Sequence, residues 1–300
     1  MAASRKFRYA LEAAGFFVLM GFLRLFNVDT ASRIGGWIGR RIFSKLSPGK
    51  TARKNLKAAF PEKSKSEIET ILTAMWDNLG RVVGEYPHLG SFNKAGPGTR
   101  ILVKGVEHVE EAAKGDRGTM FLSGHLANWE MMPMSGELWG LDGATVVRHP
   151  NNPHVARWIA KQRGLNGPKE QIGKHSGARR IFSQLRGGKV IYMLVDQRND
   201  EGIPIEFFGR PAPTTPVPAA LALKLGARIL VANNRRVNGA HFEVTVNPGP
   251  EFTPTGDDEA DTRELTKRIT AQIEAMIRSN PSQWLWIHKR WGKAGPAERG

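Results

Sequence analysis

The sequence contains no cysteine among its 300 residues. A thiol nucleophile, a thiolate metal site and a disulfide bond are therefore all excluded. Acidic residues are also few, since 28 Asp and Glu stand against 44 Lys and Arg and leave a formal net charge of +16. Such an excess requires an acidic partner, such as a nucleic acid, an anionic membrane surface or an acidic protein.

The N-terminal region lacks a long uncharged apolar run. Its most apolar stretch, residues 13–23, would rise about 16 Å as a helix, well short of the roughly 30 Å hydrocarbon core of a bilayer. Extension to Tyr9–Phe26 reaches spanning length but includes Glu12 and Arg24. Residues 1–57 carry twelve Lys or Arg and only two acidic residues, a balance that favours anionic lipid. We therefore expect residues 1–30 to form a membrane anchor, either a marginal span or an interfacial helix, with a buried core helix as the alternative.

Signals for nucleic-acid binding are missing. The sequence has no zinc-finger spacing, no aromatic RNA-binding signature and no basic heptad region. Its N-terminal aromatic residues lie within the apolar run rather than among the charges. We therefore predict no nucleic-acid partner.

The spacing of apolar residues divides the rest of the chain into two parts. Residues 31–98 are predicted to be helical, and apolar residues of Ser66–Glu85 recur at helical spacing. Strands and helices alternate over residues 99–300, which predicts an α/β core with a mixed central sheet flanked by helices. Predicted strands are Ile101–Val106, Thr119–Ser123, Ala144–Val147, Val190–Val195, Arg228–Asn233 and Phe242–Val246; predicted helices include Asn128–Leu138, Pro153–Gln162, Gly177–Leu185, Pro216–Leu225 and Thr262–Arg278.

A histidine followed five positions later by a glutamate stands out after one of these strands. His125 comes two residues after Thr119–Ser123, and Glu130 is expected in the first turn of the next helix, with Asn128 as its N-cap. On a single helix the two side chains would point about 140° apart, so they can meet only if His125 lies in the loop. An imidazole held by a carboxylate can act as a general base near neutral pH. About 0.7 such pairs are expected by chance in this composition, so the spacing alone is weak evidence.

A second carboxylate also follows a predicted strand. Asp196 comes directly after Val190–Val195. Sites in α/β sheets lie beyond the carboxyl ends of the strands, so His125 and Asp196 are expected to converge there.

Several segments together resemble the bacterial lipid A late acyltransferases, which belong to the wider glycerolipid acyltransferase group with a His-x4-Asp/Glu motif. The C-terminal segment 281–291 matches the family pattern Pro-x-Gln-Trp-x-Trp-x-His-Arg-Arg-Trp, with Lys289 in place of an arginine. Segment 207–214 matches Phe-Phe-Gly-x-Pro-Ala-x-Thr, and 124–130 carries the histidine motif. The family usually has Tyr-Arg before the proline-rich turn at residues 149–153, and this sequence has Val147-Arg148 there.

The resemblance implies an acyl thioester as donor, on acyl carrier protein or on coenzyme A, and a hydroxyl of a phosphorylated glycolipid as acceptor. An acidic carrier protein suits a basic surface. In this scheme His125 removes the hydroxyl proton while Glu130 orients the ring and stabilises the imidazolium. No Gly-x-Ser-x-Gly motif surrounds the histidine, so we expect direct attack on the thioester without an acyl-enzyme.

Five further residues are candidates for binding substrate or for stabilising charge. Arg148 is expected to bind the oxyanion or a phosphate, with a surface salt bridge as the alternative. Asp196 or Glu206 would place a second carboxylate near His125, and Glu206 is equally well interpreted as an exposed strand residue. Arg163 and Arg210 are weaker candidates for phosphate contact. We predict no metal site and no cofactor.

The tryptophans of the C-terminal segment allow two interpretations. Trp284, Trp286 and Trp291 would form a membrane-interface belt, or they would close the core.

The sequence therefore predicts an O-acyltransferase for lipid A precursors at the cytoplasmic face of a Gram-negative inner membrane. One alternative is acyl transfer to another glycolipid or to an aminolipid. A second alternative, of another class, is a basic scaffold on a membrane surface without enzymatic activity.

Overall fold

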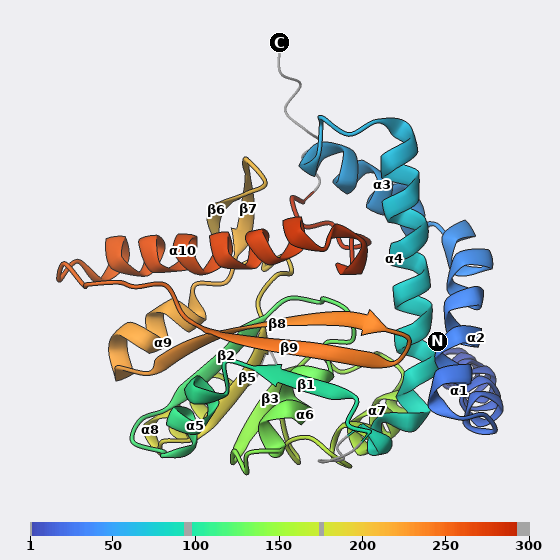
Figure 1. Ribbon diagram of the computed structural model, residues 1–300, viewed down its shortest axis with the longest axis horizontal. Helices are drawn as coiled ribbons and strands as arrows, with labels where there is room; N and C mark the ends of the chain where they lie inside the picture. Colours follow the sequence, from blue (N-terminus) through green and yellow to red (C-terminus); the bar gives the residue numbers. More distant parts are fainter. Residues whose placement is uncertain (1, 93–97, 174–176, 293–300) are drawn as a thin grey trace.

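The computed structural model describes residues 2–92, 98–173 and 177–292 (Figure 1). Its N-terminal part is helical, and the first strand begins at Ile101. The helical part consists of α1 (Ala2–Arg24), α2 (Val28–Arg41), η1 (Phe43–Lys45), α3 (Pro48–Ala59), α4 (Lys65–Glu85) and η2 (Tyr86–Ser91). The remaining elements are β1 (Ile101–Lys104), α5 (Val106–Ala113), β2 (Thr119–Ser123), α6 (Met131–Glu137), β3 (Gly143–Val147), α7 (Pro153–Arg163), β4 (Glu170–Gly173), α8 (Ala178–Arg186), β5 (Val190–Leu194), β6 (Ile203–Phe207), β7 (Arg210–Thr214), α9 (Val217–Leu225), β8 (Arg228–Asn238), β9 (His241–Pro248), α10 (Asp258–Ser279) and η3 (Pro281–Gln283).

Helices α2 and α4 pack unusually closely. A Cβ atom on Gly35 would lie 2.2 Å from the carbonyl oxygen of Gly80, so only glycine fits at this crossing. Helix α4 also begins with a complete capping box, in which the side chains of Ser64 and Glu67 each bond to the other's backbone N–H. The long α4 therefore has a fixed start and a fixed neighbour, and its C-terminal end reaches the edge of the sheet (Figure 1).

The central sheet has seven strands in the order β1-β9-β8-β2-β5-β3-β4. All neighbouring strands run parallel except β8 and β9, which are antiparallel. Strands β6 and β7 form a separate antiparallel hairpin. The predicted mixed sheet flanked by helices is confirmed.

Alternate residues of the central strands pack into two different cores. Met120 and Leu122 of β2 belong to the cluster with α9 and α10, whereas Phe121 between them belongs to the cluster with α5 and α6. Figure 1 shows α10 on one side of the sheet and α5 and α6 on the other. The sheet is thus the middle layer of three, and its strands are apolar because both faces are covered.

Three strands were missed in the sequence. Neither strand of the hairpin β6–β7 is among the predicted strands, because Pro204, Pro211 and Pro213 interrupt the pattern, but proline is tolerated where a strand does not need its N–H for a central ladder. The short edge strand β4 carries a polar sequence, Glu-Gln-Ile-Gly, with no alternation to reveal it.

The start of the helix after the histidine loop also differs from the expectation. Helix α6 begins at Met131, so Glu130 precedes the helix instead of lying in its first turn. The N-cap position is therefore occupied by Glu130 and not by Asn128. The side chain of Asn128 accepts a hydrogen bond from the N–H of Glu130 and donates one to the carboxylate of Glu85.

The division of the chain at residues 30 and 98 stays a prediction, and residues 93–97 lie outside the described ranges. In the part of the chain that the structure describes, no helix combines the length and apolarity needed to cross a bilayer.

Candidate active site

The register of the sheet brings two strand ends together. Strands β2 and β5 are parallel neighbours, with Ser123 opposite Leu194. His125 and Asp196 each lie two residues beyond these paired positions. The predicted convergence of the two side chains is confirmed.

Asp196 binds the histidine at two points. Its Oδ1 lies 2.8 Å from Nδ1 of His125, and its Oδ2 accepts a hydrogen bond of 2.8 Å from the backbone N–H of His125. The indole N–H of Trp284 donates to the same Oδ2 at 2.7 Å. The Nδ1 contact leaves Nε2 of the partly exposed ring as the nitrogen that can accept a proton.

Asp196 is buried and charged. Burial alone would raise the pKa of its carboxyl, but the charge of His125 and the hydrogen bonds from His125 and Trp284 lower that pKa well below the usual range. The anion is therefore present at neutral pH and stabilises a positive charge on the ring.

Two further polar side chains border the imidazole. The side-chain nitrogen of Gln197 lies 3.1 Å from Nε2 of His125 and 2.8 Å from Nε2 of His288. Burial lowers the pKa of His288, and the charges of His125 and Arg148 lower it further. The charge of Asp196 acts in the opposite direction and raises it. His288 is therefore neutral at neutral pH, and Arg148 is close enough to act on it.

Trp284 and His288 lie in the C-terminal segment 281–291 that carries the family resemblance, but neither these two residues nor Gln197 is predicted from the sequence to lie at the histidine. These contacts involve residues that are 72 to 163 positions from His125 along the chain, so only the folded sheet reveals them.

The loop between β2 and α6 is held by a buried polar network. Ala127 has a positive φ of 49°, and its N–H donates to the carbonyl of Gln283 at 2.8 Å. Asn128 donates to the buried carboxylate of Glu85 at 2.9 Å, and Arg236 pairs with the same carboxylate. This network attaches the histidine loop to α4 and β8 and fixes where His125 lies.

Glu130 does not hold the histidine, and the expectation of a direct contact is wrong. Its buried carboxylate accepts hydrogen bonds from Arg163, from the hydroxyl of Tyr86 at 2.6 Å and from the indole of Trp129 at 3.1 Å. None of its hydrogen bonds within the described residues goes to His125. The ring of Trp129 instead packs 5.1 Å from the ring of His125, so Glu130 reaches the histidine only through that indole.

In the pair of Glu130 and Arg163, the carboxylate is buried and the guanidinium is partly buried. Burial alone would raise the pKa of Glu130, but the charge of Arg163 and hydrogen bonds from Arg163, Tyr86 and Trp129 lower it. Because Arg163 is 2.7 Å from Glu130, it is occupied by this ion pair rather than placed for a phosphate.

The remaining sequence candidates lie at different distances from the site. Arg148 is exposed at the end of β3 and acts on His288. Glu206 is exposed on β6 and has no contact with His125 among the described residues. Arg210 stacks on the ring of Trp291 at 5.0 Å, in the hairpin region. Of these three, only Arg148 is among the charges that act on His288.

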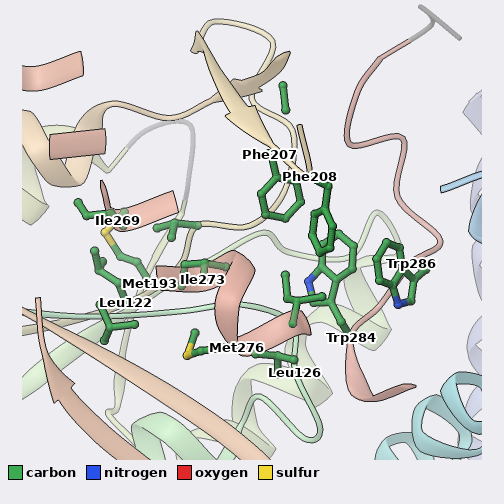
Figure 2. Close-up of a cluster of buried hydrophobic side chains, with 14 of the residues drawn as sticks. Leu122, Leu126, Met193, Phe207, Phe208, Ile269, Ile273, Met276, Trp284 and Trp286 are labelled. Carbon is green, nitrogen blue, oxygen red and sulfur yellow. The ribbon is translucent and has the colours of Figure 1, made fainter. Parts of the chain in front are cut away.

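The three C-terminal tryptophans are buried, so the membrane-belt interpretation is wrong and the core interpretation is confirmed. Trp284 and Trp286 pack against Phe207 and Phe208 of the hairpin (Figure 2). The hairpin and the C-terminal segment thus cover the sheet beside Asp196.

A small cavity of about 10 Å³, enough for about one water molecule, lies between the hairpin, α9 and α10 and reaches Asp196. Asp196 and Arg290 form part of its wall, and the rest is mostly apolar. Ile269 and Ile273 of α10 point toward the sheet residues Leu122 and Met193 in this region (Figure 2). The lining residues are Val195, Asp196, Phe207, Thr214, Thr215, Pro218, Ala219, Thr266, Ile269, Thr270, Ile273 and Arg290.

Arg290 is buried in that wall. Its guanidinium donates to the carbonyl of Pro213 at 2.7 Å and to the hydroxyl of Thr214 at 2.6 Å. Burial lowers its pKa to about 10, with Asp196 acting in the opposite direction, so the group is charged at neutral pH. The wall of the cavity is therefore mostly apolar and carries charge at Asp196 and Arg290.

Across residues 2–92, 98–173 and 177–292, no group of three or more His, Cys, Asp or Glu side chains is placed to hold a metal ion.

A histidine with one nitrogen held by a buried aspartate, at the carboxyl edge of a sheet and beside an apolar pocket, is an arrangement suited to general acid–base enzymes whose substrates have an apolar part. The comparison with known protein families agrees. The family model described as bacterial lipid A biosynthesis acyltransferase matches residues 2–293, and the chain belongs to this family. It is an acyltransferase.

The relatives act on more than one kind of glycolipid. The chain is 25% identical over 249 residues to a lipid A biosynthesis palmitoleoyltransferase of Escherichia coli, covering 80% of this chain and 77% of that protein. It is 24% identical over 282 residues to a lipid A biosynthesis myristoyltransferase of the same organism, covering 91% and 83%. It is also 24% identical over 269 residues to a phosphatidylinositol mannoside acyltransferase of Mycobacterium tuberculosis, covering 84% and 80%.

Proposed function

We propose that this acyltransferase moves a fatty acyl chain from an acyl thioester, carried by acyl carrier protein, to a hydroxyl of a lipid A precursor. The observation that carries the proposal is the contact between His125 and Asp196, which leaves Nε2 of the imidazole available to accept a proton. Asp196 also forms part of the wall of the mostly apolar cavity. The two lipid A relatives favour this acceptor over other glycolipids.

The reaction proceeds in one displacement. Nε2 of His125 takes the proton of the acceptor hydroxyl as the oxygen attacks the thioester carbonyl carbon. Asp196 stabilises the imidazolium that forms. The C–S bond then breaks, the sulfur leaves with its electron pair, and the imidazolium returns the proton to the sulfur.

Glu130 acts indirectly in this scheme. Its carboxylate fixes Trp129, and the indole packs against the imidazole. Arg163 keeps Glu130 ionised in its buried position. The two residues position the histidine and do not touch the substrate.

The acyl chain of the donor enters between the hairpin, α9 and α10, where the mostly apolar wall of the cavity suits a hydrocarbon. The cavity itself has a volume of about 10 Å³, so these elements must separate to admit the chain. Arg148, exposed near His288, contacts a phosphate of the acceptor. The net charge of +16 suits an acidic carrier protein as donor.

The protein works at the cytoplasmic face of the inner membrane, where α1 lies in the bilayer interface. Large apolar side chains of α1 and of the turn after it face outward, including Phe7 at 74% exposure, Val18 at 74% and Leu25 at 80%. Phe16 faces the other way and packs against Trp158 of α7. A helix with one packed face and one exposed apolar face, among basic residues, suits an anionic lipid surface.

The proposed function is tested with the purified protein and with a lipid A precursor as acceptor. The wild type is expected to transfer acyl chains from acyl carrier protein faster than from coenzyme A. His125→Ala is expected to lose several orders of magnitude in kcat while its thermal unfolding stays unchanged. Transfer at the wild-type rate by His125→Ala would contradict the proposed base, and transfer only to a mannosylated phospholipid would favour the second acceptor class.

A further inference from the structure

The proposed reaction needs a hydrogen-bond donor that stabilises the negative charge developing on the thioester oxygen. Three consecutive backbone N–H groups of the histidine loop, at residues 125–127, are already engaged. That of His125 donates to Asp196, that of Leu126 to the carbonyl of Gly124, and that of Ala127 to the carbonyl of Gln283, each at 2.8 Å. The loop therefore offers none of these three groups as an oxyanion donor.

The carboxamide of Gln197 lies where such a donor is needed. Its nitrogen is 3.1 Å from Nε2 and 3.4 Å from Nδ1 of His125. The lone pair of Nε2 points away from the ring. A nitrogen on the axis of this lone pair, at 3.1 Å from Nε2, would therefore be well beyond hydrogen-bond distance of Nδ1. The amide nitrogen therefore lies to the side of that axis, and the direction of attack remains open for the acceptor hydroxyl.

His288 fixes the direction of the amide. Its Nε2 lies 2.8 Å from the amide nitrogen, and the neutral ring can accept one N–H. A carboxamide carries two N–H groups in one plane. With one held by His288, the second is directed toward the space beside Nε2 of His125.

We propose that Gln197 is the oxyanion donor of the acyl transfer and that His288 is the residue that positions it. This inference rests on the proposed function. As the acceptor oxygen bonds to the carbonyl carbon, the electron pair of the C=O bond moves onto its oxygen, which accepts a hydrogen bond from Gln197. When the C=O bond re-forms, the C–S bond breaks and the sulfur takes the proton from His125. Arg148 is then free to bind a phosphate.

The test compares Gln197→Met, which has similar length and no donor, with the wild type. Loss of one oxyanion donor is expected to lower kcat by about 10²–10³-fold, with the KM of the acyl donor changed by less than a few fold. Asn199→Ala is the matched control, because the contact of Asn199 with Pro213 is made by its backbone N–H. His288→Phe is expected to show a smaller loss in kcat, also without a large change in KM.

Two additional measurements separate an oxyanion donor from a packing residue. A phosphonate analogue of the tetrahedral intermediate should bind Gln197→Met more weakly by about the factor lost in kcat/KM, while a thioether analogue without the carbonyl should bind as in the wild type. Gln197→Glu should lose a similar factor in kcat. Its new negative charge should also move the acid limb of the pH profile to higher pH, by raising the pKa values of the two neighbouring imidazoles.

If Gln197→Met does not fold, Gln197→Asn replaces it, since this variant keeps the carboxamide but withdraws it by one methylene. Two results would overturn the assignment of Gln197 while leaving the proposed function intact, provided that the wild type is active. One is a kcat of Gln197→Met within threefold of the wild-type value, and the other is equal weakening of the binding of both analogues. A folded wild type that transfers no acyl chain from any thioester would overturn the proposed function and this inference with it.

Discussion

Nδ1 of His125 lies 2.8 Å from Oδ1 of Asp196, although 71 residues separate them in the sequence. The contact arises because β2 and β5 are adjacent parallel strands in a register that ends both at the same level. Asp196 is in turn held by the indole of Trp284 from the C-terminal segment. The chemistry of the site therefore depends on three distant segments.

Asp196→Asn should lower kcat by about 10³–10⁴-fold, because a neutral amide cannot stabilise the imidazolium and disturbs the tautomer of His125. Steady-state kinetics with acyl carrier protein thioesters measures the effect. Glu206→Gln is the control, since this carboxylate is exposed on the hairpin and should leave kcat unchanged. A larger loss in Glu206→Gln than in Asp196→Asn would reverse the assignment of the carboxylate.

Glu130→Gln should destabilise the fold by about 3–5 kcal/mol, because it leaves the partly buried guanidinium of Arg163 without its buried counter-charge. Chemical unfolding measures the loss. Glu170→Gln, which breaks the more exposed pair with Arg180, should change stability little. The double variant Glu130→Gln with Arg163→Met should recover part of the stability, and a purely additive loss would show that the two side chains are not coupled.

Stability should fall in acid. The pKa values of Glu130 and Asp196 are lowered in the folded state, whereas in the unfolded chain these residues titrate near 4.3 and 3.9. The unfolded state therefore binds more protons at low pH, so this stabilisation is complete above about pH 5 and is lost as the pH falls through 4 and below. Unfolding free energies between pH 7 and pH 3 measure the slope, which should be shallower in Glu130→Gln. An equal slope in both proteins would contradict the lowered pKa of Glu130.

Ala219→Leu should shift the preferred donor to shorter acyl chains, because Ala219 is fully buried in the wall of the pocket. Each methylene that no longer fits should cost about 10–200-fold in kcat/KM for the long donor. Competition between donors of different chain length gives the ratio directly. Ala220→Leu, at an exposed position on the same helix, should leave the preferred chain length unchanged. An unchanged preference in both variants would show that the acyl chain binds elsewhere.

Val18→Asp combined with Leu25→Asp should weaken binding to lipid vesicles, because both side chains are exposed on the apolar face of α1 and the turn that follows it. Co-sedimentation with vesicles of phosphatidylcholine and phosphatidylglycerol measures binding. Val217→Asp, an exposed apolar residue on α9, serves as control. Wild-type binding should also fall with added salt, because part of it is electrostatic. Equal binding by the double variant and the wild type would place the contact with lipid on another surface.

Much of the architecture could be predicted from local pattern. Strand β2 was predicted with its observed bounds, and β5 to within one residue, because buried parallel strands are short continuous apolar runs. The hairpin β6–β7 could not be predicted, since its prolines resemble those of a loop and its stability comes from packing against the C-terminal tryptophans. Glu130 was assigned to His125 by proximity in sequence, but burial beside Arg163 and Tyr86 gave its carboxylate other partners.

The sequence by itself determined the class of fold, the basic and apolar character of the N-terminal helix, and the presence of a histidine and an aspartate at two strand ends. These are properties of composition and of short periodic segments, which need no knowledge of distant contacts. Only the tertiary structure decided that Asp196 rather than Glu130 binds the imidazole, and that Gln197, Trp284 and His288 surround it. Such pairings depend on strand order and register, because hydrogen bonds form between side chains that are close in space, whatever their separation along the chain.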